Sequence, residues 1–91
     1  MNKKIYFMLV HRNTGGFWGE FPDLPGCMTD GYDQDDLLRN AADALASWIE
    51  GKLRLGEALP EASSLEAVKY YAMKCDEEVV SIIPVNTTLE D

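Results

Sequence analysis

The chain has 91 residues, of which 46% are hydrophobic and 26% are charged; this composition is typical of one globular domain, here residues 1–91, and excludes a disordered or collagen-like chain. Sixteen acidic residues against eight basic ones give a formal net charge of −8, which repels phosphate backbones, so we expect no direct binding of nucleic acid. No stretch approaches the ~20 apolar residues that cross a bilayer or resembles a signal peptide, so we expect a cytoplasmic protein without membrane contact.

Three strands are predicted in the first third of the chain. Residues 5–10 are aromatic and β-branched and lead into Asn13-Thr14-Gly15-Gly16, a turn cluster that suits a β-hairpin. Residues 16–21 then return antiparallel as the second strand, because the connection is short. Pro25-Gly26 suits the centre of a type II turn, after which residues 27–31 form the third strand.

A long amphipathic helix follows these strands. Asp33 is the predicted N-cap, and Asp36 adds a second carboxylate at the positive end of the helix. Apolar residues recur at spacings of three and four between positions 37 and 55, and Gly56 ends the helix. Because the apolar stripe is broad, we expect this helix to lie across one face of the sheet.

Two further elements complete the predicted order β-β-β-α-(α)-β. Ser63-Ser64-Leu65-Glu66 supplies an S-x-x-E capping box, with Ser63 as the cap of a short second helix that runs to about residue 73. The β-branched run 79–85 predicts a strand in which Pro84 is confined to the end or to an edge of the sheet. We therefore predict an α+β fold: a three-stranded antiparallel sheet plus a further strand, with one long helix packed on one face.

Six acidic residues without a base lie between positions 20 and 36: Glu20, Asp23, Asp30, Asp33, Asp35 and Asp36. Carboxylates that converge on one point could hold a divalent metal, but acids are also common in turns and at helix starts. The same cluster could instead be a docking patch for a basic partner. With a single histidine, His11, and no Cys-x-x-Cys pair, we expect no metal site, no cofactor, no catalytic residues and no enzyme activity.

The aromatic side chains are numerous for one small sheet. Phe17 and Trp18 are neighbours on the second strand, so their side chains point to opposite faces and only one of them can face the long helix. The other lies on the open face of the sheet, either without a partner or as an interface anchor, a role in which tryptophan is enriched.

Residues 15–31, Gly-Gly-Phe-Trp-Gly-Glu-Phe-Pro-Asp-Leu-Pro-Gly-Cys-Met-Thr-Asp-Gly, together with Asn-Ala-Ala-Asp-Ala-Leu at 40–45, resemble the N-terminal domain of the HicB-type antitoxins. The resemblance runs from about residue 4 to residue 60. It implies a partial RNase H-like fold without nuclease activity, and a homo-oligomer. It also implies a partner: a small basic HicA-type toxin that cleaves mRNA and whose active site the antitoxin masks in a type II toxin–antitoxin system.

The chain departs from this family at its C-terminal end. HicB antitoxins commonly carry a C-terminal DNA-binding module, whereas only residues 86–91 follow the last predicted strand; we expect no such module in this chain.

We expect partner-binding residues among the acidic and aromatic side chains of the matched segment, which are Trp18, Glu20, Asp23, Asp30, Tyr32 and Asp33. Charge reversal of Glu20, Asp23 and Asp30 is expected to weaken binding without unfolding the domain. Two other functions remain open: a metal-dependent RNase H-like nuclease or RNA-processing protein, and an orphan oligomeric adaptor without a toxin.

Overall fold

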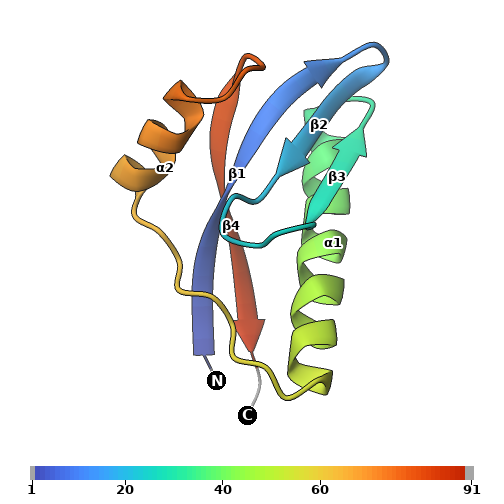
Figure 1. Ribbon diagram of the computed structural model, residues 1–91. Coiled ribbons are helices and arrows are strands. Elements are labelled where there is room, and N and C mark those ends of the chain that lie inside the picture. Colours follow the sequence, from blue (N-terminus) through green and yellow to red (C-terminus); the bar gives the residue numbers. More distant parts are fainter. Residues whose placement is uncertain (1, 90–91) are drawn as a thin grey trace.

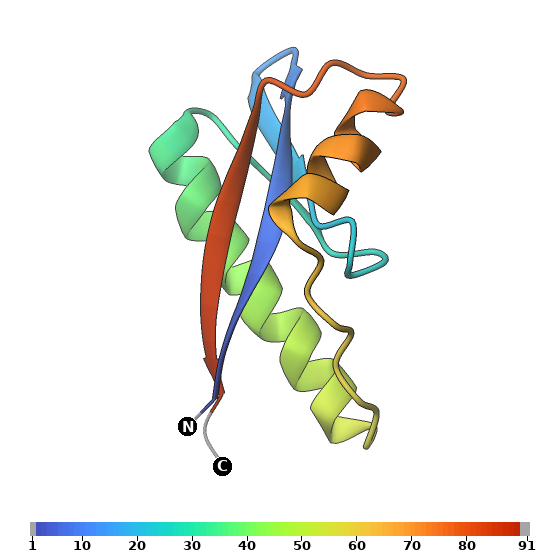
Figure 2. The same cartoon turned by 90° about the vertical axis from the view of Figure 1, so that its left-hand side faces the viewer.

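Within residues 2–89, which the computed structural model describes, four strands and two helices follow one another in the predicted order. They are β1 (Asn2–Asn13), β2 (Gly16–Glu20), β3 (Met28–Gly31), α1 (Gln34–Arg54), α2 (Leu65–Met73) and β4 (Ser81–Leu89). The strands form one antiparallel sheet in the order β3-β2-β1-β4. The long α1 lies along one side of the sheet and the short α2 on the other (Figure 1, Figure 2). The predicted α+β fold is confirmed.

β4 differs from its prediction in length and placement. It begins at Ser81 and continues to Leu89, four residues beyond the predicted end at position 85, because it pairs with β1 all the way from Val10↔Ser81 to Asn2↔Leu89. Residues 90–91 of the predicted C-terminal remainder lie outside the described residues. The prediction for Pro84 is confirmed: β4 is an outer strand, where a residue without an N–H is tolerated.

The main core lies between the sheet and α1. Alternate residues of β1 (Tyr6, Met8 and Val10) pack against one stripe of α1, formed by Leu37, Ala41, Leu45 and Ile49. Burial of each large aliphatic side chain in such a core contributes ~1.5–3 kcal/mol. The predicted helix ends are also confirmed, since the carboxylate of Asp33 accepts from the Asp36 N–H at 2.8 Å and Gly56 adopts φ +74° just after the C-cap.

The cap of α2 differs from its prediction. Ser64, not Ser63, is the N-cap, and its hydroxyl accepts from the backbone N–H of Ala67. Ser63 is occupied elsewhere: its N–H and its hydroxyl donate to the two carboxylate oxygens of Asp23, at 2.8 and 2.6 Å. The tertiary contact with Asp23 therefore decides which of two adjacent serines caps the helix.

Candidate partner-binding surface

The strand register divides the predicted site residues between two faces of the sheet. Phe17 packs against the core beside α1, whereas Trp18 is half-buried on the opposite face. Glu20 shares that face with Trp18, and the pairs Trp18↔Asp30 and Glu20↔Met28 bring in two residues of β3. Met28 was not predicted as a site residue, although its side chain is 59% exposed. Trp18, Glu20, Asp30 and Met28 thus form one continuous patch, called here the open face.

His11 forms the floor of the open face. The residue is only 1% exposed, and its ring stacks on Trp18 with a centroid distance of 4.4 Å and an interplanar angle of 19°. Nε2 lies 2.7 Å from Oε2 of Glu20, and Nδ1 lies 2.9 Å from the carbonyl oxygen of Glu78. We predicted His11 only as a strand residue. A two-residue turn at Thr14-Gly15 implies that position 11 pairs with position 18. The predicted hairpin was therefore sufficient to place His11 opposite Trp18.

Asp23 lies apart from the open face and serves an internal contact. It is half-buried in the loop between β2 and β3, where both of its carboxylate oxygens accept from Ser63. Trp48 of α1 holds the same loop by donating from Nε1 to the carbonyl oxygen of Pro25 at 3.0 Å. At the end of this loop, burial raises the pKa of the Cys27 thiol to about 11. Asp23 therefore positions the segment before α2.

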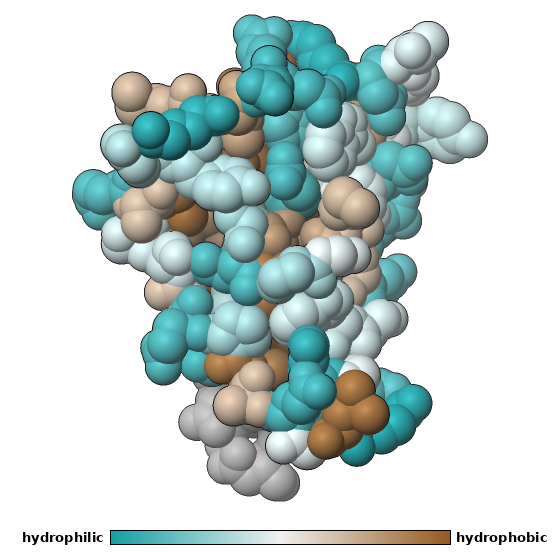
Figure 3. Space-filling view, in the orientation of Figure 1, coloured by the Kyte–Doolittle hydropathy of each residue, from teal (hydrophilic) through white to brown (hydrophobic). Residues whose placement is uncertain are grey.

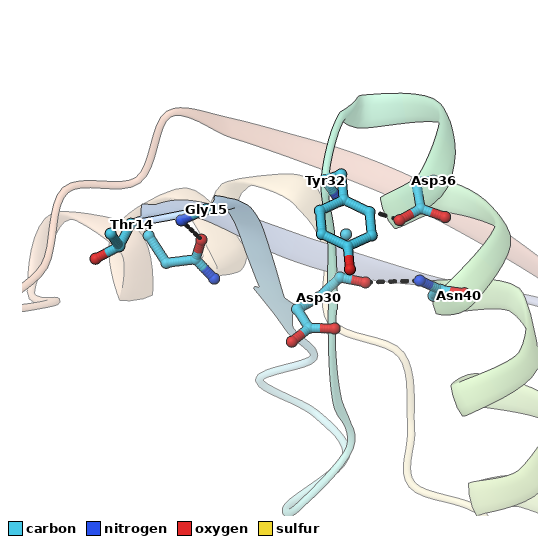
Figure 4. Close-up of a pocket in the computed structure, with 8 residues that line it drawn as sticks. Thr14, Gly15, Asp30, Tyr32, Asp36 and Asn40 are labelled. Atoms are coloured by element: carbon cyan, nitrogen blue, oxygen red, sulfur yellow. Dashed lines mark hydrogen bonds between the residues drawn. The ribbon is translucent and has the colours of Figure 1, made fainter.

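Asp30 and Tyr32 line a cleft of about 500 Å³ between the β1–β2 turn, the end of β3 and the start of α1 (Figure 4). Tyr32 is 86% exposed, and its backbone N–H donates to Oδ2 of Asp36 at 3.0 Å. Asn40 donates to the carbonyl oxygen of Asp30 at 2.8 Å. Asp33, also exposed, is engaged as the N-cap beside this cleft. Hydrophilic side chains dominate this end of the molecule in the view of Figure 3.

The cleft and the open face offer carboxylates and exposed rings, and they are joined through Asp30. Among the described residues, no group of three or more His, Cys, Asp and Glu side chains is arranged to hold a metal ion. Neither of the two helices within residues 2–89 is long and apolar enough to cross a membrane. The arrangement is suited to binding a cationic, partly apolar protein surface.

The predicted carboxylates therefore do not act as one set. Asp30 remains available at the surface, whereas Asp23 accepts hydrogen bonds from Ser63 and Glu20 is hydrogen-bonded to His11. The expectation that the domain stays folded after charge reversal at all three positions remains a prediction, and positions 20 and 23 test it most severely. A lysine at position 20 would face a buried imidazole, and one at position 23 would lose both contacts with Ser63.

Comparison with known proteins places this fold in a described family. The profile of the family described as "HicB_like antitoxin of bacterial toxin-antitoxin system" matches residues 6–91. An uncharacterized 14.9 kDa protein from the rep-hol intergenic region of Haemophilus phage HP1 (strain HP1c1) is 31% identical over 62 residues, which cover 68% of this chain and 47% of the phage protein. The chain thus spans about half the length of this relative.

Solved structures with the same fold include a HicA3 and HicB3 toxin-antitoxin complex, in which one chain matches with a TM-score of 0.72 and 26% identity, over 97% of this chain and 100% of that chain. The N-terminal domain of the antitoxin HicB from Burkholderia pseudomallei matches with a TM-score of 0.67 and 20% identity, over 96% and 99% of the two chains. At 20% identity, the second likeness shows the fold alone.

Proposed function

The chain belongs to the family of HicB-like antitoxins of bacterial toxin–antitoxin systems, and from this premise we propose that it binds a small basic HicA-type toxin and masks the toxin's active site. The observation that carries the proposal is the surface built from Trp18, Asp30 and Tyr32, which joins the open face to the cleft. A net charge of −8 steers a basic partner toward the chain. A solved relative of the same fold is in a complex of HicA3 and HicB3.

The proposed contacts differ in kind. Tyr32 and Met28 are large exposed side chains that a partner would remove from water, and a central tyrosine of this type contributes ~2 kcal/mol or more when it is a hot spot. Asp30 supplies the carboxylate between them, and Asp33 lies at the rim. Glu20 and Asp23 act indirectly, because each holds a neighbouring part of the chain in place.

The first experiment is to co-express the chain with a small basic toxin encoded beside it, purify the complex and measure RNA cleavage by the toxin. We expect a stable complex in which cleavage is lost. Asp30→Lys is expected to weaken binding at least about tenfold, with a stronger effect at low salt. The matched control is Glu57→Lys, which makes the same charge change at an exposed position after the C-terminal end of α1 and is expected to leave affinity within about twofold.

Two results would contradict the proposal. Either the toxin stays active and unbound in the presence of the wild-type chain, or Asp30→Lys and Tyr32→Ala bind the toxin as tightly as Glu57→Lys does. In the first case the orphan adaptor becomes the better hypothesis. In the second case the chain remains an antitoxin but uses a different surface.

The remaining functional expectations belong to the same proposal. We propose that the chain is a cytoplasmic, non-catalytic binding module that does not itself bind nucleic acid, and that it forms a homo-oligomer. Incubation of the purified chain with RNA and Mg²⁺ tests for nuclease activity, because a metal-dependent nuclease would degrade the RNA. Light scattering on the purified chain measures the oligomeric state.

A further inference from the structure

His11 is a buried titratable group that lies beneath the proposed binding surface and touches it through Trp18. A carbonyl oxygen can only accept a hydrogen bond, so the contact with Glu78 requires that Nδ1 of His11 carries a proton and donates it. The contact between Nε2 and Oε2 of Glu20, at 2.7 Å, also requires a proton. Either the imidazolium donates it to the carboxylate, or the protonated carboxyl group donates it to neutral Nε2. In both arrangements, His11 and Glu20 together hold one proton more than a neutral imidazole and a free carboxylate.

The titratable groups of α2 and of the segment after it lie on the same side of the sheet as the pair. The charge of Glu20 is the main cause that raises the pKa of Tyr71 on α2, and it also raises that of Cys75, where burial is the larger cause. Asp76 and Glu77 act on Cys75 in the same direction. Lys74, the C-cap of α2, directs its ammonium group to the Tyr70 ring, 4.9 Å from the ring centre. Glu20 therefore faces α2 as well as His11.

The ring of His11 is also the surface on which Trp18 rests. The two rings are stacked at 4.4 Å, and a charged imidazolium attracts the indole face more strongly than a neutral ring does. The side chain of Glu20 is 23% exposed, so the pair lies just beneath the open face. The position of the proton therefore bears directly on the orientation of Trp18.

We propose that the proton shared by His11 and Glu20 sets the orientation of Trp18, so that binding of the basic partner through Trp18 is linked to protonation. His11 is a positioning residue in this scheme. When the pH rises until the pair loses its shared proton, the lone pair of Nε2 faces the carboxylate, the contact becomes repulsive and the stack loosens. The consequence for binding rests on the proposed function, whereas the link between the proton and Trp18 does not.

The link between the proton and Trp18 is tested without a partner. His11 is the sole histidine of the chain, so its two ring nitrogens give unambiguous ¹⁵N signals. A Trp48→Phe background leaves Trp18 as the one tryptophan, whose emission reports the stack as the pH is raised. Near neutral pH we expect to observe the shared proton, either as protonation of both ring nitrogens of His11 or as a proton on Oε2 of Glu20. Trp18 emission is expected to change at the pH at which this proton is lost. The proposal is overturned if His11 is a single neutral tautomer beside an ionised Glu20. It is also overturned if Trp18 emission does not change during this titration.

Substitutions test the linkage to binding. Glu20→Gln keeps a hydrogen-bond partner for Nε2 but removes the charge, so it is expected to shift the transition in Trp18 emission to lower pH and to weaken toxin binding about tenfold. Glu57→Gln, the same change at an exposed site, is the control and is expected to change neither. His11→Gln is the second variant, with circular dichroism to check its fold; it is expected to abolish the pH dependence of Trp18 emission.

The two failures are distinguishable. If the wild-type chain binds no toxin while the spectroscopic transition is observed, the proposed function is wrong and the positioning of Trp18 by the proton stands. If the toxin binds but Glu20→Gln binds it with the same affinity and pH profile, the linkage of protonation to binding is overturned and the proposed function stands.

Discussion

Asp23 links two segments that are 40 residues apart, and its removal gives a quantitative test of the fold. Its two carboxylate oxygens accept from the N–H and the hydroxyl of Ser63, so Asp23→Ala deletes both hydrogen bonds. A hydrogen bond to a charged group contributes roughly 1.5–3 kcal/mol, but both residues are only half-buried and water replaces part of the loss. We expect a decrease of ~2 kcal/mol in the free energy of unfolding, which lowers the Tm of a domain of this size by roughly 8–16 °C.

Urea unfolding of four proteins measures this effect: wild type, Asp23→Ala, Ser63→Ala and the double variant. Ser63→Ala removes the hydroxyl but keeps the backbone N–H, so about 1 kcal/mol should be lost. The double variant should be no less stable than Asp23→Ala, because the serine hydroxyl has no acceptor once the carboxylate is absent. A loss below ~0.5 kcal/mol for Asp23→Ala, or strictly additive losses, would refute the assignment of Asp23 to an internal contact.

Three other outcomes follow from the structure. Gly16→Ala should destabilise the chain by at least ~2 kcal/mol, because a Cβ there would lie 2.3 Å from the carbonyl oxygen of Gly31 and φ is +157°. Thermal unfolding measures this loss, with Gly15→Ala as the control, because a Cβ at position 15 meets nothing within 4 Å. Burial, then Asp23 and Glu61, raise the pKa of Tyr6 above its ordinary value of 10.0, so the folded chain keeps this proton longer than the unfolded chain does. Its contribution to stability should be lost as the pH rises above about 10; urea titrations at pH 9 to 11 should show a steeper loss for wild type than for Tyr6→Phe, and equal slopes would contradict this. Since burial raises the pKa of Cys27 to about 11, a Cys75→Ser variant should react with a thiol reagent at pH 8 only after unfolding; rapid reaction of the native variant would show that Cys27 is accessible.

Local sequence determined most of the secondary structure. The turn at Asn13–Gly16, the N-cap Asp33 and the stop at Gly56 depend on residues within a few positions of one another, so their side-chain chemistry is sufficient to predict them. The position of Pro84 on an outer strand was predictable for the same reason, because a residue without an N–H interrupts any strand paired on both sides. The resemblance over residues 15–31 was similarly local, and the family match confirms it.

The tertiary structure alone decided how the candidate site residues are used. The capping-box spacing to Glu66 favours Ser63 over Ser64, and only the return of the chain to Asp23 reverses this choice. His11 supports the open face from below because Glu78, 67 positions later, supplies a carbonyl oxygen that accepts a hydrogen bond from its second ring nitrogen. Carboxylates that look equivalent along the chain, such as Asp23 and Asp30, differ because hydrogen bonding and burial depend on which distant segments meet, and no local pattern encodes that meeting.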